Sequence, residues 1–474
     1  MRQLLGESRG VRPEKAVAPP VRGGFQLPYL GSALDFGRNP VEFLRRAQRR
    51  LGNVFSFPLL GKQVTVLLGP KAHEAFFRAP DDQLSLREAY RVTVPIFGPG
   101  VAYDASPEQY DAHLALLFPA LRDERLQAYA RIMQDEAERY FERWPDRGEV
   151  DLLDAMNELT MYTSSRTLIG DEFRSRVSAE FARLYNSLEG GLNMLNMLVS
   201  PYLPTLANYR RDKARARVVE IISGIVRERR LSGREGVDFL QTLMSARLPD
   251  GTALNDETIT GILLTLVFAG QHTSAVTATW TGVLLLQHPL WLGPILAEQA
   301  KVFGSDDLQI TLERLKALHV LERSIMEAER LHPPFVLLMR TVLRDLEFGG
   351  FCAPAGGLAM VSATVAHRLP EVFADPDRYD PDRFASPRKE HKRNNYALIG
   401  FGGGKHRCVG ATFAYLQIKA IWSVLLSRFD LHLTAADYRP DYSDMVVGPR
   451  HPCTVRFERR RRASGSGQSE PKRN

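Results

Sequence analysis

Cysteine is scarce in this chain, and its scarcity excludes several classes of protein. Cys352, Cys408 and Cys453 are too few and too far apart for a disulfide framework or an iron–sulfur cluster, which fits a reducing compartment. The first residues also lack the apolar run of a signal peptide or membrane anchor. We therefore expect a cytoplasmic protein without a transmembrane anchor, associated with a membrane at most peripherally.

An excess of positive charge is also missing from most of the chain. The formal net charge is +7 over 474 residues, but segment 459–474 carries +5 of it and contains Ser-Gly-Ser-Gly. The remainder is close to neutral, so we expect no nucleic-acid partner. Composition predicts a flexible lead-in over 1–24, a single domain over 25–458 and a flexible basic tail over 459–474.

Strand patterns are few, whereas helical spacing runs through most of the chain. Two β-rich runs within 53–69 surround Gly61–Lys62 and predict a hairpin. Helical spacing dominates 107–331 and returns at 411–427, before a short strand near 453–457. The pattern predicts a mainly α fold with a small β-rich part.

One stretch, from Ile259 to Leu286, is apolar except for Gln271-His-Thr-Ser274 at its centre. Its length allows a membrane span, but four adjacent polar groups would each be costly in lipid. We expect instead a helix through the core of a large domain, with its polar groups meeting a ligand.

The segment Phe401-Gly-Gly-Gly-Lys-His-Arg-Cys408-Val-Gly410 is the most informative in the sequence. Its glycines permit tight turns and leave room for a flat ligand. Cys408 precedes a helical pattern, where the helix dipole favours the thiolate, and Gly410 is expected to let that helix approach closely. A lone cysteine is more often a small buried apolar residue. This arrangement instead indicates a thiolate that binds the iron of a macrocycle.

Phe401, Gly404, Cys408 and Gly410 resemble the haem-binding signature of the cytochrome P450 superfamily. The resemblance implies the mainly α cytochrome P450 fold with a small β-rich lobe. It also implies a haem b cofactor, with Cys408 as the ligand of its iron, and a monooxygenase activity. Flavin- and nicotinamide-binding fingerprints are missing from the sequence, so the electrons are expected from a separate protein.

Glu327-Ala-Glu-Arg330 places Glu327 and Arg330 on one face of a helix. Alone, such a pair is usually a surface ion pair of little energetic value. In the superfamily this Glu and Arg lock to an Arg in a Pro-x-Arg-Phe segment, which Arg383 matches here. The resemblance implies a structural role for all three residues.

Opposite a haem, the interrupted apolar helix offers groups that a monooxygenase needs. Gly270 leaves space for a small ligand, and Thr273 and His272 can relay protons to dioxygen. A mid-helix His is often a core residue, and a Thr there often bonds its own backbone. With the resemblance in place, the proton relay is the preferred interpretation.

Two segments narrow the resemblance to the sterol 14α-demethylases. Gly270-Gln-His-Thr-Ser274 has a His where most of the superfamily has a carboxylate, and Tyr90 to Asp104 is similar to that family's substrate-side signature. The resemblance extends from about Gly31 to Arg456. It implies that three residues contact the haem propionates, namely Tyr90, Arg340 and His406. It implies that eight residues line the sterol pocket: Val92, Phe97, Phe268, Ala269, Phe335, Leu337, Met445 and Val446.

Two departures from the family pattern stand out. Val92 occupies a position that usually holds a larger Phe, Leu or Ile, which bears on the C4-methylation of the preferred sterol. Gly400 replaces the usual Pro before the cysteine loop.

By this resemblance the protein removes the 14α-methyl group of a sterol in three successive oxygenations and releases formate. Dioxygen is the co-substrate, and NADPH-derived electrons arrive through a separate ferredoxin and ferredoxin reductase. Azole-type inhibitors are expected to bind the haem iron. A hydroxylase of another bulky terpenoid or lipid shares every haem feature and stays open. A haem gas sensor would have no use for Thr273 and His272, and a cysteine hydrolase would need a better-placed base than His406.

Overall fold

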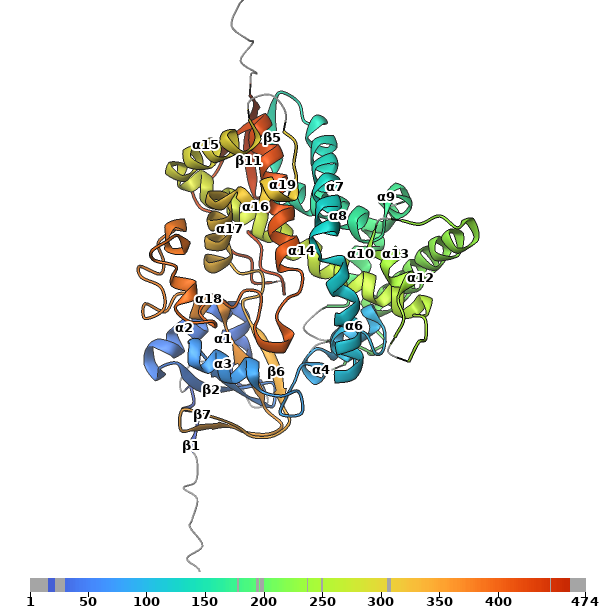
Figure 1. The fold of residues 1–474 in the computed structure, drawn as a ribbon. Coiled ribbons are helices and arrows are strands. Elements are labelled where there is room, and N and C mark those ends of the chain that lie inside the picture. The colour runs from blue at the N-terminus through green and yellow to red at the C-terminus, as the bar shows by residue number, and fades with distance from the viewer. Residues whose placement is uncertain are drawn as a thin grey trace, which may run out of the picture.

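The structure is a computed structural model that describes residues 16–21, 30–176, 179–192, 196, 200–236, 238–248, 250–304, 308–443 and 445–460. Most of the expected lead-in and basic tail therefore lies outside the described residues. A helical body rises from a β-rich region, which packs with helices α1 (Ala33–Arg38) and α2 (Pro40–Leu51) (Figure 1). The prediction of a mainly α fold with a small β-rich lobe is confirmed.

Long helices form the body. They are α6 (Pro107–Ala120), α7 (Asp123–Glu142), α8 (Leu152–Leu168), α10 (Ala179–Glu189), α12 (Leu206–Ser232), α14 (Asp256–Gln287), α15 (Leu292–Phe303), α17 (His319–Leu331) and α19 (Ala411–Arg428). Shorter helices connect them: α3 (Pro70–Arg78), α4 (Leu86–Ala89), α5 (Val94–Phe97), α9 (Asp171–Arg176), α13 (Phe239–Ser245), α16 (Leu312–Ala317) and α18 (Ala363–Ala366). The helix predicted over 411–427 is confirmed as α19.

The strands form three small sheets, with orders β2-β3-β9-β6-β4, β10-β11-β5 and β1-β8-β7. Their bounds are β1 (Ala16–Val17), β2 (Val54–Leu59), β3 (Lys62–Leu67), β4 (Leu84–Ser85), β5 (Arg147–Asp151), β6 (Leu338–Val342), β7 (Leu346–Phe348), β8 (Phe351–Ala353), β9 (Leu358–Val361), β10 (Phe429–Leu433) and β11 (Thr454–Arg459). The strand predicted near 453–457 corresponds to β11.

The predicted hairpin is present as β2 and β3, which pair antiparallel with Val54 opposite Leu67. Its turn is Leu60–Gly61, one residue earlier than the expected Gly61–Lys62. Both turn residues have positive φ, 51° and 76°. A two-residue turn of this kind matches the right-handed twist of the strands, whereas Lys62 already pairs with Leu59.

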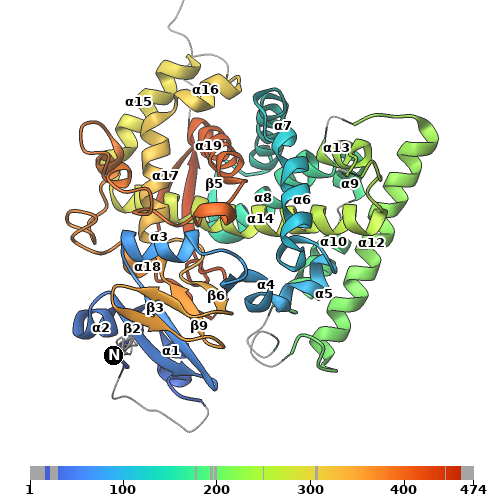
Figure 2. The ribbon, with the colours of Figure 1, turned by 60° about the horizontal axis from the view of Figure 1, so that its bottom comes forward.

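Helix α14 crosses the middle of the molecule and is the predicted core helix (Figure 2). Asn255 caps its start by accepting a hydrogen bond from Thr258 N at 2.8 Å. It packs against α8, α12, α17 and α19. A Cβ at Gly282 would lie 2.4 Å from the ring of Trp422, so this glycine lets α19 approach.

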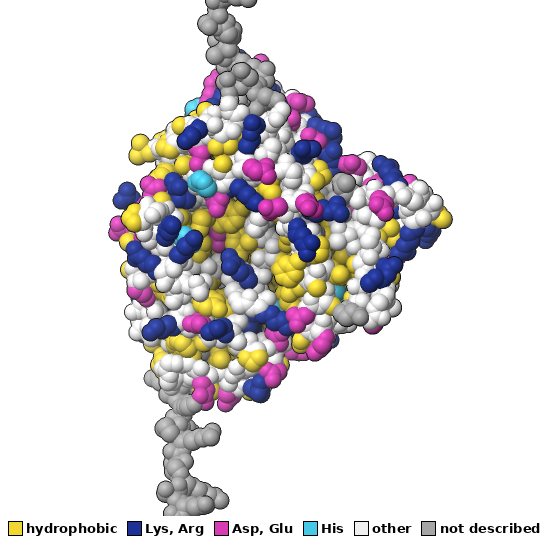
Figure 3. Space-filling model, viewed as in Figure 1, with side chains coloured by type: hydrophobic (Ala, Val, Ile, Leu, Met, Phe, Trp, Pro, Cys, Tyr) yellow, Lys and Arg dark blue, Asp and Glu magenta, His cyan; other side chains and the backbone are white. Residues whose placement is uncertain are grey.

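Two helices, α14 and the segment Gly404–Arg428, are long and apolar enough to cross a membrane by length and composition alone. Their most apolar windows are 61% and 67% buried inside the protein, as in core helices of a folded domain. On the face shown in Figure 3, positive and negative side chains are interspersed, with hydrophobic side chains in the recesses between them.

Candidate functional site

The cysteine loop makes tight turns that favour glycine. Gly402 and Gly404 have φ of 68° and 62°, and a Cβ at Gly404 would lie 2.3 Å from Phe77 O. The backbone N–H of Cys408 donates to Phe401 O at 2.9 Å and closes the loop. For Gly410, by contrast, the nearest atom to an added Cβ is Cys408 Sγ at 3.8 Å. The expectation that Gly410 lets α19 approach closely stays a prediction.

Cys408 lies in a recess, since its side chain is reached by solvent although protein surrounds most of it. Burial raises the pKa of its thiol above the usual value. The backbone N–H groups of Gly410 and Ala411, at the start of α19, point to the sulfur and lower the pKa in part. These donors are the ones expected from the position of the cysteine before a helix, and they suit a sulfur that carries negative charge.

The middle of α14 is the open part of this helix. Ala269 is exposed and Phe268 half-buried, although Leu263, Leu264, Ala275 and Trp280 on either side are buried. Thr273 donates its hydroxyl hydrogen to Ala269 O in its own helix. The Thr273 oxygen can still accept a hydrogen bond from another group, whereas its own hydroxyl hydrogen is bonded to the backbone.

His272 contacts helix α10. Its ring stacks on Tyr185 with centroids 5.5 Å apart, and its Nε2 lies 3.2 Å from Glu189 Oε1. Burial lowers the pKa of His272 to about 4, so the imidazole is neutral at pH 7 and does not form an ion pair with Glu189. Because the Glu189 side chain is 41% exposed, the pair links α14 to solvent. No motif in the sequence pointed to Tyr185 or Glu189.

The three residues expected at the propionates lie near one another. Arg340 is 2% exposed and donates to Phe76 O at 3.1 Å, and burial lowers its pKa. Tyr90 accepts a hydrogen bond from Met339 N at 3.3 Å and interacts electrostatically with Arg340. His406 also contacts an acid, since its Nε2 lies 2.7 Å from Asp81 Oδ1.

A haem fits these residues. Arg340 is a buried cation whose hydrogen bonds, among the described residues, go to backbone carbonyls rather than to a carboxylate. Such a cation suits the carboxylate of a propionate. The sulfur in its recess, backed by backbone donors, suits an iron ligand.

The expected sterol-lining residues border three different parts of the core. Phe97 belongs to the cluster around α12 and α14, and its ring meets Phe268 at 5.8 Å edge to face. Leu337 packs on the β-rich lobe and Val446 on the helical body. The remaining members differ in exposure: Val92 is buried, Phe335 half-buried and Met445 exposed.

The predicted structural trio forms one buried ion cluster. Glu327 accepts two hydrogen bonds from Arg330, at 2.7 and 2.9 Å, and one from Arg383 at 3.0 Å. All three side chains are 0% exposed. His367 links this cluster to the cysteine loop, since its Nδ1 lies 3.2 Å from Arg330 O and its Nε2 accepts from Ile399 N at 2.9 Å. The role of His367 had no signal in the sequence.

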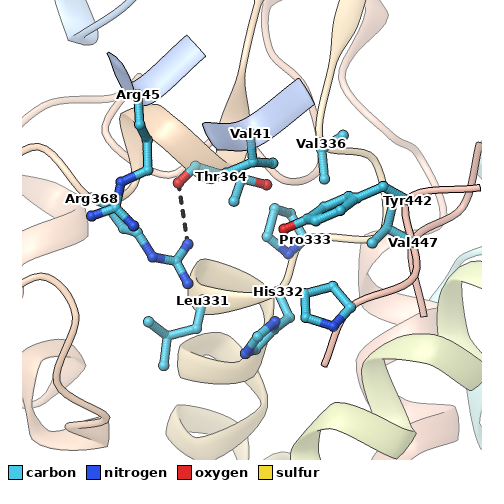
Figure 4. Close-up of a pocket in the computed structure, with 11 residues that line it drawn as sticks. Val41, Arg45, Leu331, His332, Pro333, Val336, Thr364, Arg368, Tyr442 and Val447 are labelled. Atoms are coloured by element: carbon cyan, nitrogen blue, oxygen red, sulfur yellow. Dashed lines mark hydrogen bonds between the residues drawn. The ribbon is translucent and has the colours of Figure 1, made fainter. Parts of the chain in front are cut away.

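A separate cavity of about 90 Å³ lies between α2, α18 and the chain after α17 (Figure 4). Arg45, Arg368 and Tyr442 line its polar side, and Arg368 donates to Thr364 O at 3.2 Å. None of the residues expected at the haem or the sterol lines this cavity. It is therefore distinct from the candidate site.

Comparison with known proteins agrees with this geometry. The family model described as cytochrome P450 matches residues 21–457. The sterol 14-demethylase of Arabidopsis thaliana is 38% identical over 91% of this chain and 90% of the relative. The sterol 14alpha-demethylase of Mycobacterium tuberculosis is 39% identical over 93% and 98%.

Solved structures are similar in fold. The retinoic acid-bound cyanobacterial CYP120A1 superposes with a TM-score of 0.82 at 24% identity, over 94% of this chain and 99% of that one. The match of family model, length and fold leads to one conclusion: this chain belongs to the cytochrome P450 family.

Proposed function

We propose that this protein is a sterol 14α-demethylase. The observation that carries the proposal is the similarity, over nine-tenths of both chains, to relatives from a plant and a bacterium that are named for this activity. The apolar residues Phe97, Phe268 and Ala269 near the middle of α14 support it, since a sterol offers almost no polar groups for recognition.

The reaction we propose has three successive oxygenations of the 14α-methyl group, to the alcohol, to the aldehyde and finally to formate. Each oxygenation consumes one dioxygen, two electrons and two protons, and the last one breaks a carbon–carbon bond and leaves a ring double bond. A bound haem would supply the activation of dioxygen, with its iron held by Cys408.

The other site residues would orient groups and move protons. Arg340 and Tyr90 would hold the propionates, and His406 would do so together with Asp81 or after leaving it. His272, in contact with the half-exposed Glu189, would bring protons from solvent towards Thr273. The buried cluster of Glu327, Arg330 and Arg383 would keep the chain behind Cys408 in place.

Members of this family receive their electrons from redox partners. We propose a ferredoxin and its NADPH-dependent reductase as the donors, a cytoplasmic location with peripheral membrane contact at most, and inhibition by azoles that bind the haem iron. We also propose that residues 25–458 form a single domain.

Turnover of the haem-loaded protein tests the proposal. With ferredoxin, reductase and NADPH, lanosterol and obtusifoliol should each be compared with an unrelated terpenoid. We expect formate and a 14-demethylated product from at least one sterol and none from the terpenoid. An alcohol that accumulates without formate would identify a hydroxylase instead, and no turnover of any substrate would favour a gas sensor.

A further inference from the structure

A second acid on α17, Glu329, is buried although the mechanism above does not use it. Glu329 is 2% exposed, and its Oε2 accepts a hydrogen bond from Tyr415 Oη at 2.6 Å. Its Oε1 is buried and has no hydrogen-bond partner among the described residues. A buried carboxyl with one unpaired oxygen costs free energy of folding.

The carboxyl lies against the chain that leads into the cysteine loop. A Cβ at Gly400 would come 2.2 Å from Glu329 Oε1, so a glycine at this position leaves room for the oxygen. Gly400 and the buried acid therefore form one local arrangement.

The charged and titratable groups around Glu329 come from three elements. Tyr415 lies on α19 and is itself influenced by Glu322, which pairs with Lys419. Arg407 comes from the cysteine loop. Burial raises the pKa of Glu329 to about 7, although the hydrogen bond from Tyr415 and the charge of Arg407 lower it in part.

Glu329 and Cys408 interact through their charges. Burial is the main cause that raises the pKa of Cys408, and the Glu329 carboxylate raises it further. In a region of low dielectric constant, two negative charges repel each other strongly. Any negative charge added at the sulfur and its iron would therefore favour the neutral, protonated Glu329.

We propose that Glu329 is a positioning residue that acts through Cys408 and takes up one solvent proton when the haem iron accepts one electron from the redox partner. The electron adds one negative charge to the thiolate–iron unit. The proton neutralises the negative charge of the nearby Glu329 carboxylate. The reduction potential of the protein then depends on pH. This inference rests on the haem ligation of the proposed function.

Potentiometric titration of the haem-loaded, sterol-free protein between about pH 5.5 and 8.5 tests this inference. We expect the potential of the wild-type protein to fall as the pH rises through the region around 7, because the carboxylate form disfavours the added electron. Glu329→Gln keeps an oxygen that accepts from Tyr415 but cannot titrate, so its potential should not change with pH. Tyr415→Phe removes a hydrogen bond that lowers the pKa of Glu329, so the dependence should move to higher pH.

Infrared difference spectra of the reduced and oxidised protein give a second readout. The band of a protonated carboxyl should appear on reduction in the wild-type protein and be missing in Glu329→Gln. Glu142→Gln, at an exposed acid on α7, is the matched control and should keep the wild-type profile.

A wild-type potential that does not change with pH overturns the inference, and so does a dependence that survives in Glu329→Gln. If Glu329→Gln does not bind haem, Tyr415→Phe replaces it in the test. A pH dependence of the potential that is not shifted in Tyr415→Phe then overturns the inference. Absence of a thiolate-type spectrum in the wild-type protein would contradict the haem ligation itself, and this outcome is distinguishable from the others.

Discussion

The two sides of the proposed haem site are built in different ways. Behind Cys408, buried groups are tied together: Glu327 bonds two arginines, and His367 joins Arg330 to the chain before the loop. On the α14 side, Ala269 is exposed, and the Thr273 hydroxyl donates a hydrogen bond within its own helix. The hydrogen-bonded groups behind Cys408 fix the position of the iron ligand. On the α14 side there is room for a substrate, and the substrate determines which contacts form.

The largest effect on spectrum and turnover is expected from a substitution of Cys408. Cys408→Ala removes the thiolate, so we expect loss of the thiolate-type absorption of the reduced carbon-monoxide complex and of all detectable turnover. Absorption spectra of the purified variant check this, and an unchanged spectrum would contradict the assignment of the ligand. Cys453→Ala, at a buried cysteine away from the loop, is the control and should keep the wild-type spectrum.

Breaking the buried ion cluster should be next in size. Glu327→Gln leaves the guanidinium groups of Arg330 and Arg383 without their shared carboxylate in a site that is 0% exposed. Removing one partner of such a pair costs about 3–5 kcal/mol. Urea denaturation of the haem-loaded variant measures the loss. Glu322→Gln on the same helix disturbs an ion pair that is partly exposed and should cost less.

The open side is sensitive in catalysis rather than in folding. Thr273→Ala removes the hydroxyl nearest the middle of α14, so we expect formate production to fall about 10²-fold, the usual contribution of one proton-transfer group. Stability should change little, because the hydrogen bond that is lost lies within one helix. The measurement is the rate of formate release at saturating sterol and NADPH. An unchanged rate would exclude Thr273 from the proton relay.

At acid pH, the burial of His272 should lower the free energy of unfolding. Its pKa is lowered from 6.5 to about 4, so between these values the unfolded chain binds a proton that the folded protein does not. Stability is therefore lost as the pH falls from 6.5 towards 4 and is unaffected above 6.5. His272→Phe keeps a ring for Tyr185 and should reduce this acid loss by about 2 kcal/mol, less than the full shift implies because the side chain is 23% exposed. Thermal unfolding at both pH values gives the difference.

The contrast between the sides also explains what the sequence could predict. The cysteine loop, the Glu327–Arg330 pair and the core helix are local patterns, and the helix and the ion cluster are found as expected. The hairpin turn lies one residue before the position that the sequence predicts. The reason is that Leu60 has a positive φ, a conformation that is expected of glycine. His367, Asp81 and Glu189 were missed because their partners are distant in sequence. Only tertiary packing brings such pairs together.

The smallest expected effect concerns the size of the substrate-side wall. Val92 is 3% exposed in the turn Arg91–Thr93. Val92→Phe should fill space beside the sterol, because each extra methylene group changes discrimination by about 1–3 kcal/mol. We expect the ratio of kcat/KM for a sterol with one C4-methyl group to that for one with two to rise about 10-fold. Competition between obtusifoliol and lanosterol measures this ratio directly, with Val94→Ile in the neighbouring helix α5 as the control. A ratio that does not change in Val92→Phe, in a variant that still turns over both sterols, would mean that this wall does not touch the C4 substituents.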